Sequence, residues 1–223
     1  MAGLPGLRIS SYEWAGAREA MVRFGPDAGA PVVVAALPLF EEGNRTRAAM
    51  VDVLRRLAAR GIGGALPDLP GTGESLVATC DATLAMWRAA FAAACAAVGG
   101  PVHVVAWRSG ALVDGAAAAV SRWYLAPQSG AGLVRELERV RRLAGGEDFA
   151  GNALSDAMIE GLAGAEPATM APLRVIRLAS DVKAADRKVP GTALWRGVEP
   201  GLDAALQAVI ADDVAAWVAS CSP

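Results

Sequence analysis

Histidine is almost absent from this 223-residue sequence, in which His103 is the single imidazole. The three cysteines, Cys80, Cys95 and Cys221, are an odd number and have no CxxC spacing. A structural zinc site needs about four grouped nitrogen or sulfur ligands, and a disulfide framework needs paired thiols. The sequence therefore excludes a metal site and a disulfide scaffold, and it indicates no cofactor.

An excess of charge of one sign is also missing. The chain has 21 Lys and Arg against 23 Asp and Glu, for a formal net charge of −2. Proteins that bind a phosphate backbone usually carry a basic patch or stripe, whereas the arginines here are interleaved with acids. We therefore expect no nucleic-acid partner.

Long apolar runs are lacking too. The most apolar stretch, residues 89–100, is well short of the roughly 20 residues that a membrane-spanning helix needs. The first ten residues, MAGLPGLRIS, contain neither the basic region nor the apolar region of a secretory leader. These features predict a cytoplasmic protein without a membrane span.

What the sequence does contain is ordinary for a globular protein, with 54% hydrophobic and 20% charged residues. A chain of this length fits one α/β domain, and no repeat or linker divides it. We therefore predict a single domain over residues 1–223, and the composition is compatible with a homo-oligomer.

Apolar runs and helical periodicity alternate from residue 31 onward. Runs of β-branched and apolar residues predict strands covered on both faces, and apolar residues recurring every three or four positions predict helices. The expected strands are 31–37, 62–66, 102–107, 122–125, 173–178 and 192–195, and the expected helices are 44–60, about 82–98, 133–143, 155–162 and 202–218. Residues 7–12 and 18–24 alternate in polarity and predict an antiparallel pair at one edge. Such alternation favours parallel strands with right-handed crossovers.

Polar residues mark the expected helix starts. Asn44 is predicted to cap the first helix, Thr79 or Asp81 the second, and Ser155 the fourth. The stretch VHVVAWRSGALVDG, residues 102–115, is predicted to form a buried strand, a tight turn and the start of a further helix.

Three patterns in this order resemble the α/β-hydrolase superfamily. The apolar strand PVVVAAL is followed by a loop, PDLPGTGES is similar to a DxxGxGxS turn, and AWRSG at residues 106–110 occupies the place of the GxSxG elbow. The resemblance implies an α/β-hydrolase fold with a mostly parallel, doubly wound sheet and a small helical lid-like segment at about residues 128–165.

A narrower resemblance rests on PLFEEGNRTR, the elbow with arginine at its centre, YLAPQSGAGLVRELERVRRLAGG and DFAGNALSDAM. These segments resemble the exosortase A system-associated hydrolases of the second type. The resemblance implies a bacterial protein associated with exopolysaccharide production and the exosortase system.

A Ser–His–Asp triad needs a nucleophile, a histidine and an acid. The resemblance places Arg108 in the nucleophile position, and a guanidinium stays protonated and cannot attack a carbonyl. Asp181 fills the position of the acid. The histidine is expected within WRGVE, residues 195–199, which contains none, and His103 lies in the strand before the elbow. Two of the three positions are therefore empty.

Ser109 directly follows the expected nucleophile and is a weak catalytic candidate. In this fold the residue after the nucleophile supplies its backbone N–H to the oxyanion hole, while its side chain points elsewhere. The competing interpretation makes Ser109 a residue that caps or begins the next helix.

Arg108 allows two interpretations. It forms an ion pair with Glu41, Glu42 or Asp181 that stabilises the loops, or it anchors an anionic ligand at the start of a helix, where backbone N–H groups add to its donors.

The loop after the first central strand supplies the remaining candidates. Glu42 is a second weak catalytic candidate because a carboxylate there can act as general base on water. The competing interpretation is that Glu41 and Glu42 stabilise the N-terminus of the following helix, where acidic side chains are favourable. The ligand-binding residues predicted around the cleft are Arg108, Trp107, Ser109, Phe40, Glu41, Glu42 and Asn44.

Two classes of function remain open. The first is an α/β-hydrolase-fold protein without a triad that binds an anionic small molecule, peptide or saccharide in its cleft. The second is a hydrolase or acyltransferase that acts on an ester or related bond without Ser–His–Asp. The empty triad positions favour the first.

Overall fold

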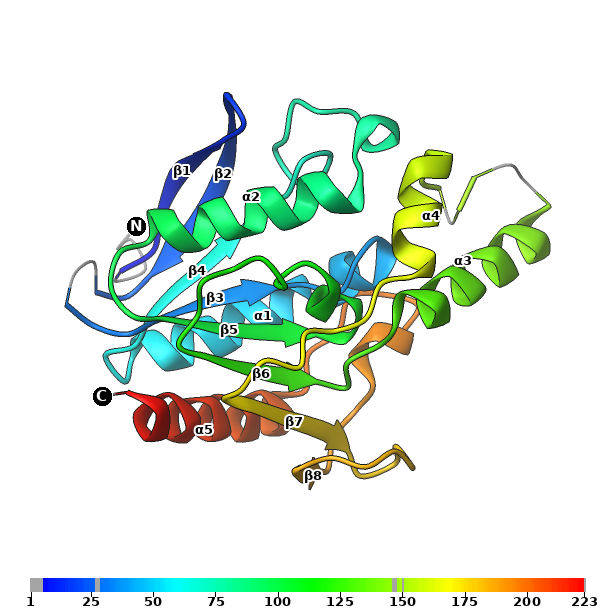
Figure 1. Cartoon of the computed structure of the whole chain (residues 1–223). Coiled ribbons are helices and arrows are strands. Elements are labelled where there is room, and N and C mark those ends of the chain that lie inside the picture. The colour runs from blue at the N-terminus through cyan, green and yellow to red at the C-terminus, as the bar shows by residue number, and fades with distance from the viewer. Residues whose placement is uncertain (1–5, 27–28, 146–147, 150, 223) are drawn as a thin grey trace.

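The computed structural model describes residues 6–26, 29–145, 148–149 and 151–222 (Figure 1). The first five residues, on which the prediction about a secretory leader partly rests, lie outside these ranges. One eight-stranded sheet runs in the order β1-β2-β4-β3-β5-β6-β7-β8. Its strands are β1 Arg8–Trp14, β2 Ala17–Phe24, β3 Val32–Ala36, β4 Gly63–Pro67, β5 Val102–Trp107, β6 Ser121–Leu125, β7 Leu173–Leu178 and β8 Arg187–Val189.

The sheet is parallel from β4 to β8, and β1 and β2 add antiparallel pairs at one edge, as predicted. The last predicted strand, 192–195, is wrong. The last strand of the sheet is β8, which ends earlier, at Val189. Leu194–Arg196 forms a 3-10 turn instead. The chain leaves the sheet after Val189, where Pro190 has no N–H for a ladder and Gly191 takes a φ of 151°.

Five α-helices accompany the sheet: α1 Glu41–Ala58, α2 Leu84–Ala97, α3 Gly130–Ala144, α4 Asp156–Ala163 and α5 Ala204–Cys221. Helices α1 and α5 cover one face and α2 covers the other (Figure 1). Helices α3 and α4 pack against each other in the connection between β6 and β7, within residues 128–165.

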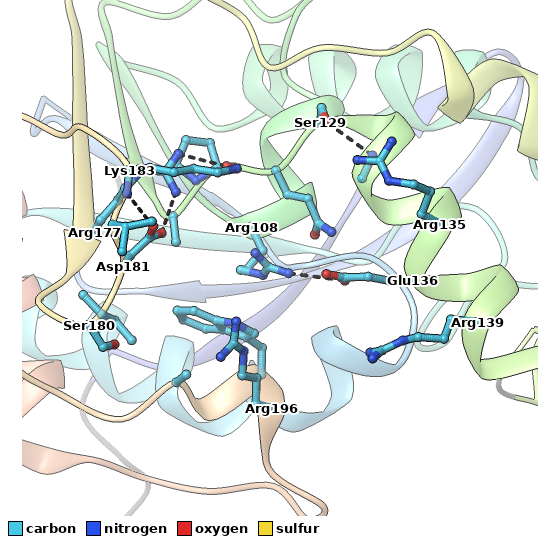
Figure 2. Close-up of a pocket in the computed structure, with 18 residues that line it drawn as sticks. Arg108, Ser129, Arg135, Glu136, Arg139, Arg177, Ser180, Asp181, Lys183 and Arg196 are labelled. Atoms are coloured by element: carbon cyan, nitrogen blue, oxygen red, sulfur yellow. Dashed lines mark hydrogen bonds and ion pairs between the residues drawn. The ribbon is translucent and has the colours of Figure 1, made fainter. Parts of the chain in front are cut away.

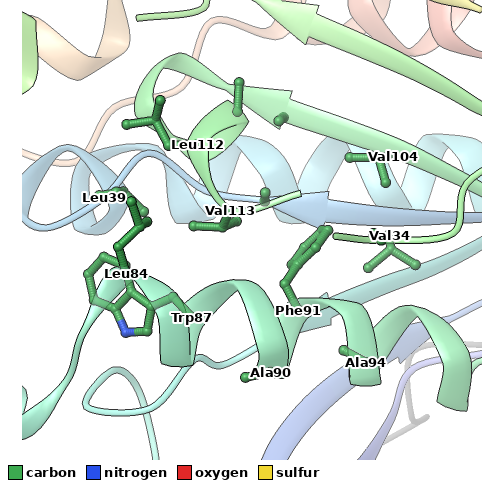
Figure 3. Packing of buried hydrophobic residues seen from close by; sticks show 14 of the residues in the cluster. Val34, Leu39, Leu84, Trp87, Ala90, Phe91, Ala94, Val104, Leu112 and Val113 are labelled. Atoms are coloured by element: carbon green, nitrogen blue, oxygen red, sulfur yellow. The ribbon is translucent and has the colours of Figure 1, made fainter. Parts of the chain in front are cut away.

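The central strands consist mainly of apolar residues because helices cover both faces of the sheet. Val34 and Val104 pack on the α2 side with Phe91 (Figure 3). Val33 and Val105 point to the opposite side, into the cluster formed with α1 and α5. Burial on both faces is typical of parallel sheets and explains why no polar alternation appears in β3 or β5.

Two predicted caps are wrong. Helix α1 begins at Glu41, so Asn44 lies inside it, and the preceding Phe40 takes a φ of 58° with no side-chain cap. The first turn instead holds Glu41 and Glu42, whose charge favours the helix N-terminus. Helix α2 is capped by the Thr83 hydroxyl, which accepts from the Met86 N–H, because Thr79–Asp81 forms a separate 3-10 turn.

The helix expected after the elbow is also wrong. Only a 3-10 turn, Arg108–Leu112, follows β5. The chain then turns toward β6, where the Arg122 Nε donates to the Asp114 carboxylate at 2.9 Å. A buried ion pair therefore anchors this segment to β6.

Among the described residues, α5 is the one helix whose length and composition would allow it to cross a membrane. Its residues Ile210, Val214 and Val218 are buried against the sheet. A covering helix of a protein core shows the same composition, so the cytoplasmic location remains a prediction.

Asp213 joins α5 to the sheet and supplies a pH-dependent contribution to stability. Its carboxylate accepts from Trp123, Arg174 and Arg187 at 2.6 to 2.8 Å. Burial acts to raise its pKa, but the hydrogen bonds from Arg174, Trp123 and Arg187 outweigh it and lower the pKa from 3.8 to about 2.

Because the folded state depresses this pKa, the stabilisation is present above pH 3.8 and is lost as the pH falls toward 2. We expect Asp213→Asn to lower the free energy of unfolding by about 2 kcal/mol at pH 7, and less below pH 3, in urea titrations. The neighbouring Asp212→Asn is the control, because its exposed ion pair with Arg60 contributes less than about 1 kcal/mol. Equal losses in both variants would contradict this account.

Candidate functional site

The turn from β5 into the 3-10 turn Arg108–Leu112 has a strained backbone. Arg108 takes a φ of 53°, a conformation that non-glycine residues rarely adopt. A Cβ on Gly110 would lie 2.5 Å from the carbonyl oxygens of Ala36 and Leu37, so the turn also needs glycine at this position. The local backbone is therefore that of a nucleophile elbow, with an arginine at its strained position.

The Arg108 guanidinium is held by two acids. Its Nε and Nη2 donate to both oxygens of Glu42 at 3.1 and 3.2 Å, and Nη2 also donates to Glu136 Oε2 at 3.4 Å. The ring of Trp195 lies 5.3 Å from the guanidinium carbon. Since the side chains of Arg108 and Glu42 are 14% and 17% exposed, this pair ties the elbow to α1 in a largely desolvated setting.

Only one of the three expected acidic partners of Arg108 therefore contacts it. Glu41 is paired with Arg45 on the next turn of α1, at 3.6 Å. Asp181 accepts from Arg177 Nη1 at 2.7 Å. The acid on α3, Glu136, takes the place of these two.

Burial raises the pKa of Glu42, although the hydrogen bond and charge of Arg108 act to lower it. A carboxyl whose pKa moves upward is better suited to accept a proton near neutral pH. Both of its oxygens, however, accept from Arg108. A water molecule would have to compete with that guanidinium for Glu42.

Ser109 is fully buried, and its Oγ accepts the Leu39 N–H at 2.9 Å. The loop that holds Leu39 is the one that contributes an N–H to the oxyanion hole in α/β-hydrolases. Here the Ser109 hydroxyl fastens that loop to the elbow.

We expect Ser109→Ala to lower the free energy of unfolding by about 1 kcal/mol, because the buried Leu39 N–H loses its acceptor. Urea unfolding checks this value, with Ser220→Ala on exposed helix surface as the control, which should differ from wild type by less than about 0.5 kcal/mol. Unchanged stability of Ser109→Ala would contradict the fastening role.

His103 lies at the start of β5, 1% exposed, with its Nδ1 at 2.8 Å from Ser121 Oγ. Arg108 lies five positions further along the chain, which corresponds to roughly 17 Å of extended strand. Burial lowers its pKa and favours the neutral ring. The single imidazole of the chain is therefore remote from the elbow.

Asp181 follows β7, at the position expected of the triad acid. Burial acts to raise its pKa, but hydrogen bonds from the Lys183 backbone N–H and from Arg177 hold the pKa below its ordinary value. Arg177 is itself fixed by the carbonyl oxygens of Ala184 and Pro127. The acid is thus oriented by an arginine in place of a histidine.

Three cavities lie around the carboxyl edge of the sheet. The first, about 540 Å³, contains Arg108 and Asp181 among its lining residues (Figure 2). The second, about 530 Å³, is lined by Phe40 and Asn44, and the third, about 650 Å³, by Phe40, Glu41, Glu42 and Arg108. Arg108 lines both the first cavity and the third.

Two predicted ligand-binding residues line none of these three cavities. Trp107 is 0% exposed and packs with α1 and α5 in the core, and Ser109 is equally buried. In this conformation neither side chain can contact a ligand in the cavities. Among the described residues, no group of three or more His, Cys, Asp or Glu is placed to hold a metal ion.

Several residues at the site were not expected from the sequence. Glu136 reaches Arg108 from α3, Arg177 holds Asp181, and the amide of Gln128 lines the first cavity. The charged positions of α3 alternate with apolar ones, a pattern that is typical of a solvated helix face. Their spacing shows that Arg135, Glu136 and Arg139 lie near one another on the helix, but not what lies opposite.

No family model matches the chain, and no curated protein sequence matches it. Among solved structures, a thermophilic esterase from Thermogutta terrifontis is similar over 97% of this chain and 100% of that one, with 16% identity and a TM-score of 0.63. A putative hydrolase from Agrobacterium vitis covers 95% of this chain and 98% of that one, with 12% identity and a TM-score of 0.60.

An epoxide hydrolase from Vigna radiata is similar over 56% of this chain, with 17% identity and a TM-score of 0.44. The matched region spans 41% of that enzyme's length. The two full-length similarities, together with the sheet order and the elbow, show that this chain has the α/β-hydrolase fold.

Proposed function

We propose that this protein is an α/β-hydrolase-fold protein without a Ser–His–Asp triad, and that its cleft binds an anionic small molecule, peptide or saccharide. The observation that carries the proposal is Arg108 at the strained elbow position, held by Glu42. A guanidinium cannot serve as nucleophile, and the only imidazole is buried in the sheet far from the turn. The feature of the cleft that remains to bind a ligand is the positive charge of the Arg108 guanidinium.

Arg108 retains donors for a ligand. Its Nε and Nη2 are used by Glu42 and Glu136, whereas no hydrogen bond joins Nη1 to another described residue. An arginine presents five N–H donors, and two belong to Nη1. Because Arg108 lines two cavities, these donors are available to an anion.

The test is an anion titration followed by thermal unfolding, with malate, glucuronate, acetate and phosphate as probes. Malate is included because the T. terrifontis esterase is described with malate bound. The variant is Arg108→Met combined with Glu42→Met, which removes the guanidinium without leaving a buried carboxylate unpaired. We expect at least one anion to stabilise wild type and to lose this effect in the double variant. Equal stabilisation of both proteins would reject the proposal.

A second candidate function is hydrolysis or acyl transfer without a triad, with Glu42 as general base on water. The raised pKa of Glu42 is the observation that favours it. This mechanism requires activity that rises with pH through the Glu42 titration and that Glu42→Gln abolishes. Turnover of nitrophenyl esters that is unchanged by Glu42→Gln would eliminate it.

We further propose that the protein acts in the cytoplasm of a bacterium, in or beside exopolysaccharide production coupled to an exosortase. The support is the sequence resemblance of the elbow, of PLFEEGNRTR and of the α3 segment. Deletion of the gene should lower secreted polysaccharide, and the Arg108→Met/Glu42→Met variant should fail to restore it. A deletion strain with unchanged polysaccharide and protein sorting would contradict this assignment.

A further inference from the structure

The first cavity concentrates positive charge. Six basic side chains line it against two acids, and Glu42 pairs with Arg108 from outside the lining, which leaves a local surplus of three positive charges in a chain whose net charge is −2. The basic residues are Arg108, Arg135, Arg139, Arg177, Lys183 and Arg196, and the acids are Glu136 and Asp181. Such a local excess favours anions over neutral ligands.

Both acids in the cavity already have partners. Glu136 contacts Arg108, and Asp181 contacts Arg177. Figure 2 shows Arg135 and Arg139 on α3, with Arg196 on the opposite wall. In the described part of the chain, no hydrogen bond or ion pair joins these three guanidinium groups to another residue. Their donors are therefore not used within the fold.

The N-terminus of α3 opens on the same cavity. Ser129 and Gly132 line it, and the Ser129 hydroxyl caps the helix by accepting the Gly132 N–H. The first turn of α3 contains no acidic residue, so the positive end of the helix dipole is not compensated within the helix. The Gly130 and Gly132 N–H groups already donate to the Ala165 carbonyl and to Ser129, so the helix favours a phosphate or carboxylate through its dipole rather than through these groups.

Gln128 provides an independent indication of a ligand. Its side chain lines the cavity, is 7% exposed, and has a buried Oε1 without a hydrogen-bond partner. The Gln128 N–H donates to the Arg108 carbonyl at 3.3 Å, which fixes the residue beside the elbow. A buried amide oxygen without a donor is costly, and a turn of the Gln128 amide toward the cavity would let a ligand hydroxyl satisfy it.

We infer that this cavity binds a small molecule that carries a phosphate monoester and neighbouring hydroxyl groups, such as a sugar phosphate. The inference rests on the proposed anion-binding function and names its ligand class. The guanidinium groups of Arg135, Arg139 and Arg196 and the α3 N-terminus hold the phosphate, and Gln128 accepts a hydroxyl. A phosphate monoester carries about −1.5 to −2 charges at neutral pH, so it matches the surplus better than a carboxylate does. The volume lies within the roughly 300–1,000 Å³ of small-molecule sites.

The experiment is isothermal titration calorimetry with glucose 6-phosphate, glucose, glucuronate and inorganic phosphate. We expect glucose 6-phosphate to bind wild type more tightly than the other three. The combined variant Arg135→Ala/Arg139→Ala should weaken its binding by about tenfold or more, since it removes two charge-assisted contacts. Arg55→Ala/Arg142→Ala removes the same charge from exposed positions outside the cavity and should leave binding within about twofold of wild type.

Gln128→Leu separates the hydroxyl contact from the phosphate contact. It should weaken binding of glucose 6-phosphate and leave binding of inorganic phosphate unchanged, and the loss of an unsatisfied buried amide should not impair folding. Vesicles that contain phosphatidylinositol 4-phosphate form the last arm. Their displacement of glucose 6-phosphate would assign the same chemistry to a lipid headgroup, and no displacement would assign it to a soluble ligand.

Three results would overturn the inference: glucose 6-phosphate binds no better than glucose, glucuronate binds more tightly, or both double arginine variants behave alike. Anion binding that depends on Arg108 and Glu42 but not on Arg135 and Arg139 would leave the anion-binding function intact and reject this ligand assignment. Absence of binding by every anion would reject both.

Discussion

Replacing Arg108 with alanine is expected to lower the free energy of unfolding by about 3 kcal/mol, because it leaves the Glu42 carboxylate desolvated without its partner. The side chain of Glu42 is 17% exposed, and Arg108 contacts both of its oxygens. Burial already raises the pKa of Glu42, and loss of Arg108 removes the interaction that opposes this rise. Urea unfolding at neutral pH measures the loss.

The pH dependence identifies the cause. A carboxyl whose pKa is raised in the folded state destabilises the protein as the pH rises through that pKa. The loss in Arg108→Ala should therefore be larger at neutral than at acidic pH. Combining Arg108→Met with Glu42→Met should recover most of the stability, because no charge is then left buried alone. Arg55→Ala on the exposed face of α1 is the control, and a loss of equal size there would contradict the account.

Asp114→Ala is expected to have a larger effect, about 4 kcal/mol, because it leaves a buried arginine without its acid. Asp114 is 0% exposed, and its Oδ2 accepts from Arg122 at 2.9 Å and from Tyr124 at 2.7 Å. Burial raises the pKa of Asp114, while Tyr124 and Arg122 act to lower it. This cluster anchors the segment after the elbow to β6.

Urea unfolding of Asp114→Ala and of Tyr124→Phe compares the free energy lost with the ion pair to the free energy lost with a single hydrogen bond. Tyr124→Phe removes one hydrogen bond and should cost about 1 kcal/mol. Asp114→Leu combined with Arg122→Met should lie closer to wild type than Asp114→Ala, because both charges are absent. A loss below that of Tyr124→Phe in Asp114→Ala would show that the ion pair does not hold the segment.

The sheet could be predicted because burial on both faces leaves a direct pattern in the sequence. The run at β3 is apolar at every position, the run at β5 is apolar except for His103, and the helix periodicity between them indicated the crossovers. The 3-10 turn after the elbow could not be predicted from the strand-turn-helix pattern, and the contact of Asp114 with Arg122 of a neighbouring strand leaves no local signal. Gly110 and Gly115 also weaken the helix propensity of this segment.

The elbow itself was predictable, but its surroundings were not. The frame AWRSG located the turn, and the empty histidine position followed from a residue count. The partner of Arg108 was among three named acids, yet Glu136 lies 28 residues away on α3 and contacts Arg108 because α3 packs against the turn after β5. The first cavity also could not be predicted, because its basic residues come from the elbow, from α3, from β7 and the loop after it, and from the turn at residues 194–196.

Trp107 illustrates the limit of inference from neighbouring positions in the sequence. Adjacent residues of a strand point to opposite faces, so proximity to the elbow does not place a side chain in the cleft. Trp107 points into the core shared with α1 and α5. The residues that do line the cavities come from the loops at the carboxyl edge, from parts of several strands, and from helices that include α1, α2 and α3.

Intact-mass spectrometry after treatment with a fluorophosphonate tests the central claim that this fold carries no serine nucleophile here. A serine without a base is a poor nucleophile, and Ser109 is buried with its hydroxyl bound to the Leu39 N–H. The account predicts an unmodified mass for wild type, with an active serine esterase labelled in parallel as the control. A stoichiometric adduct on any serine, and on Ser109 above all, would contradict it.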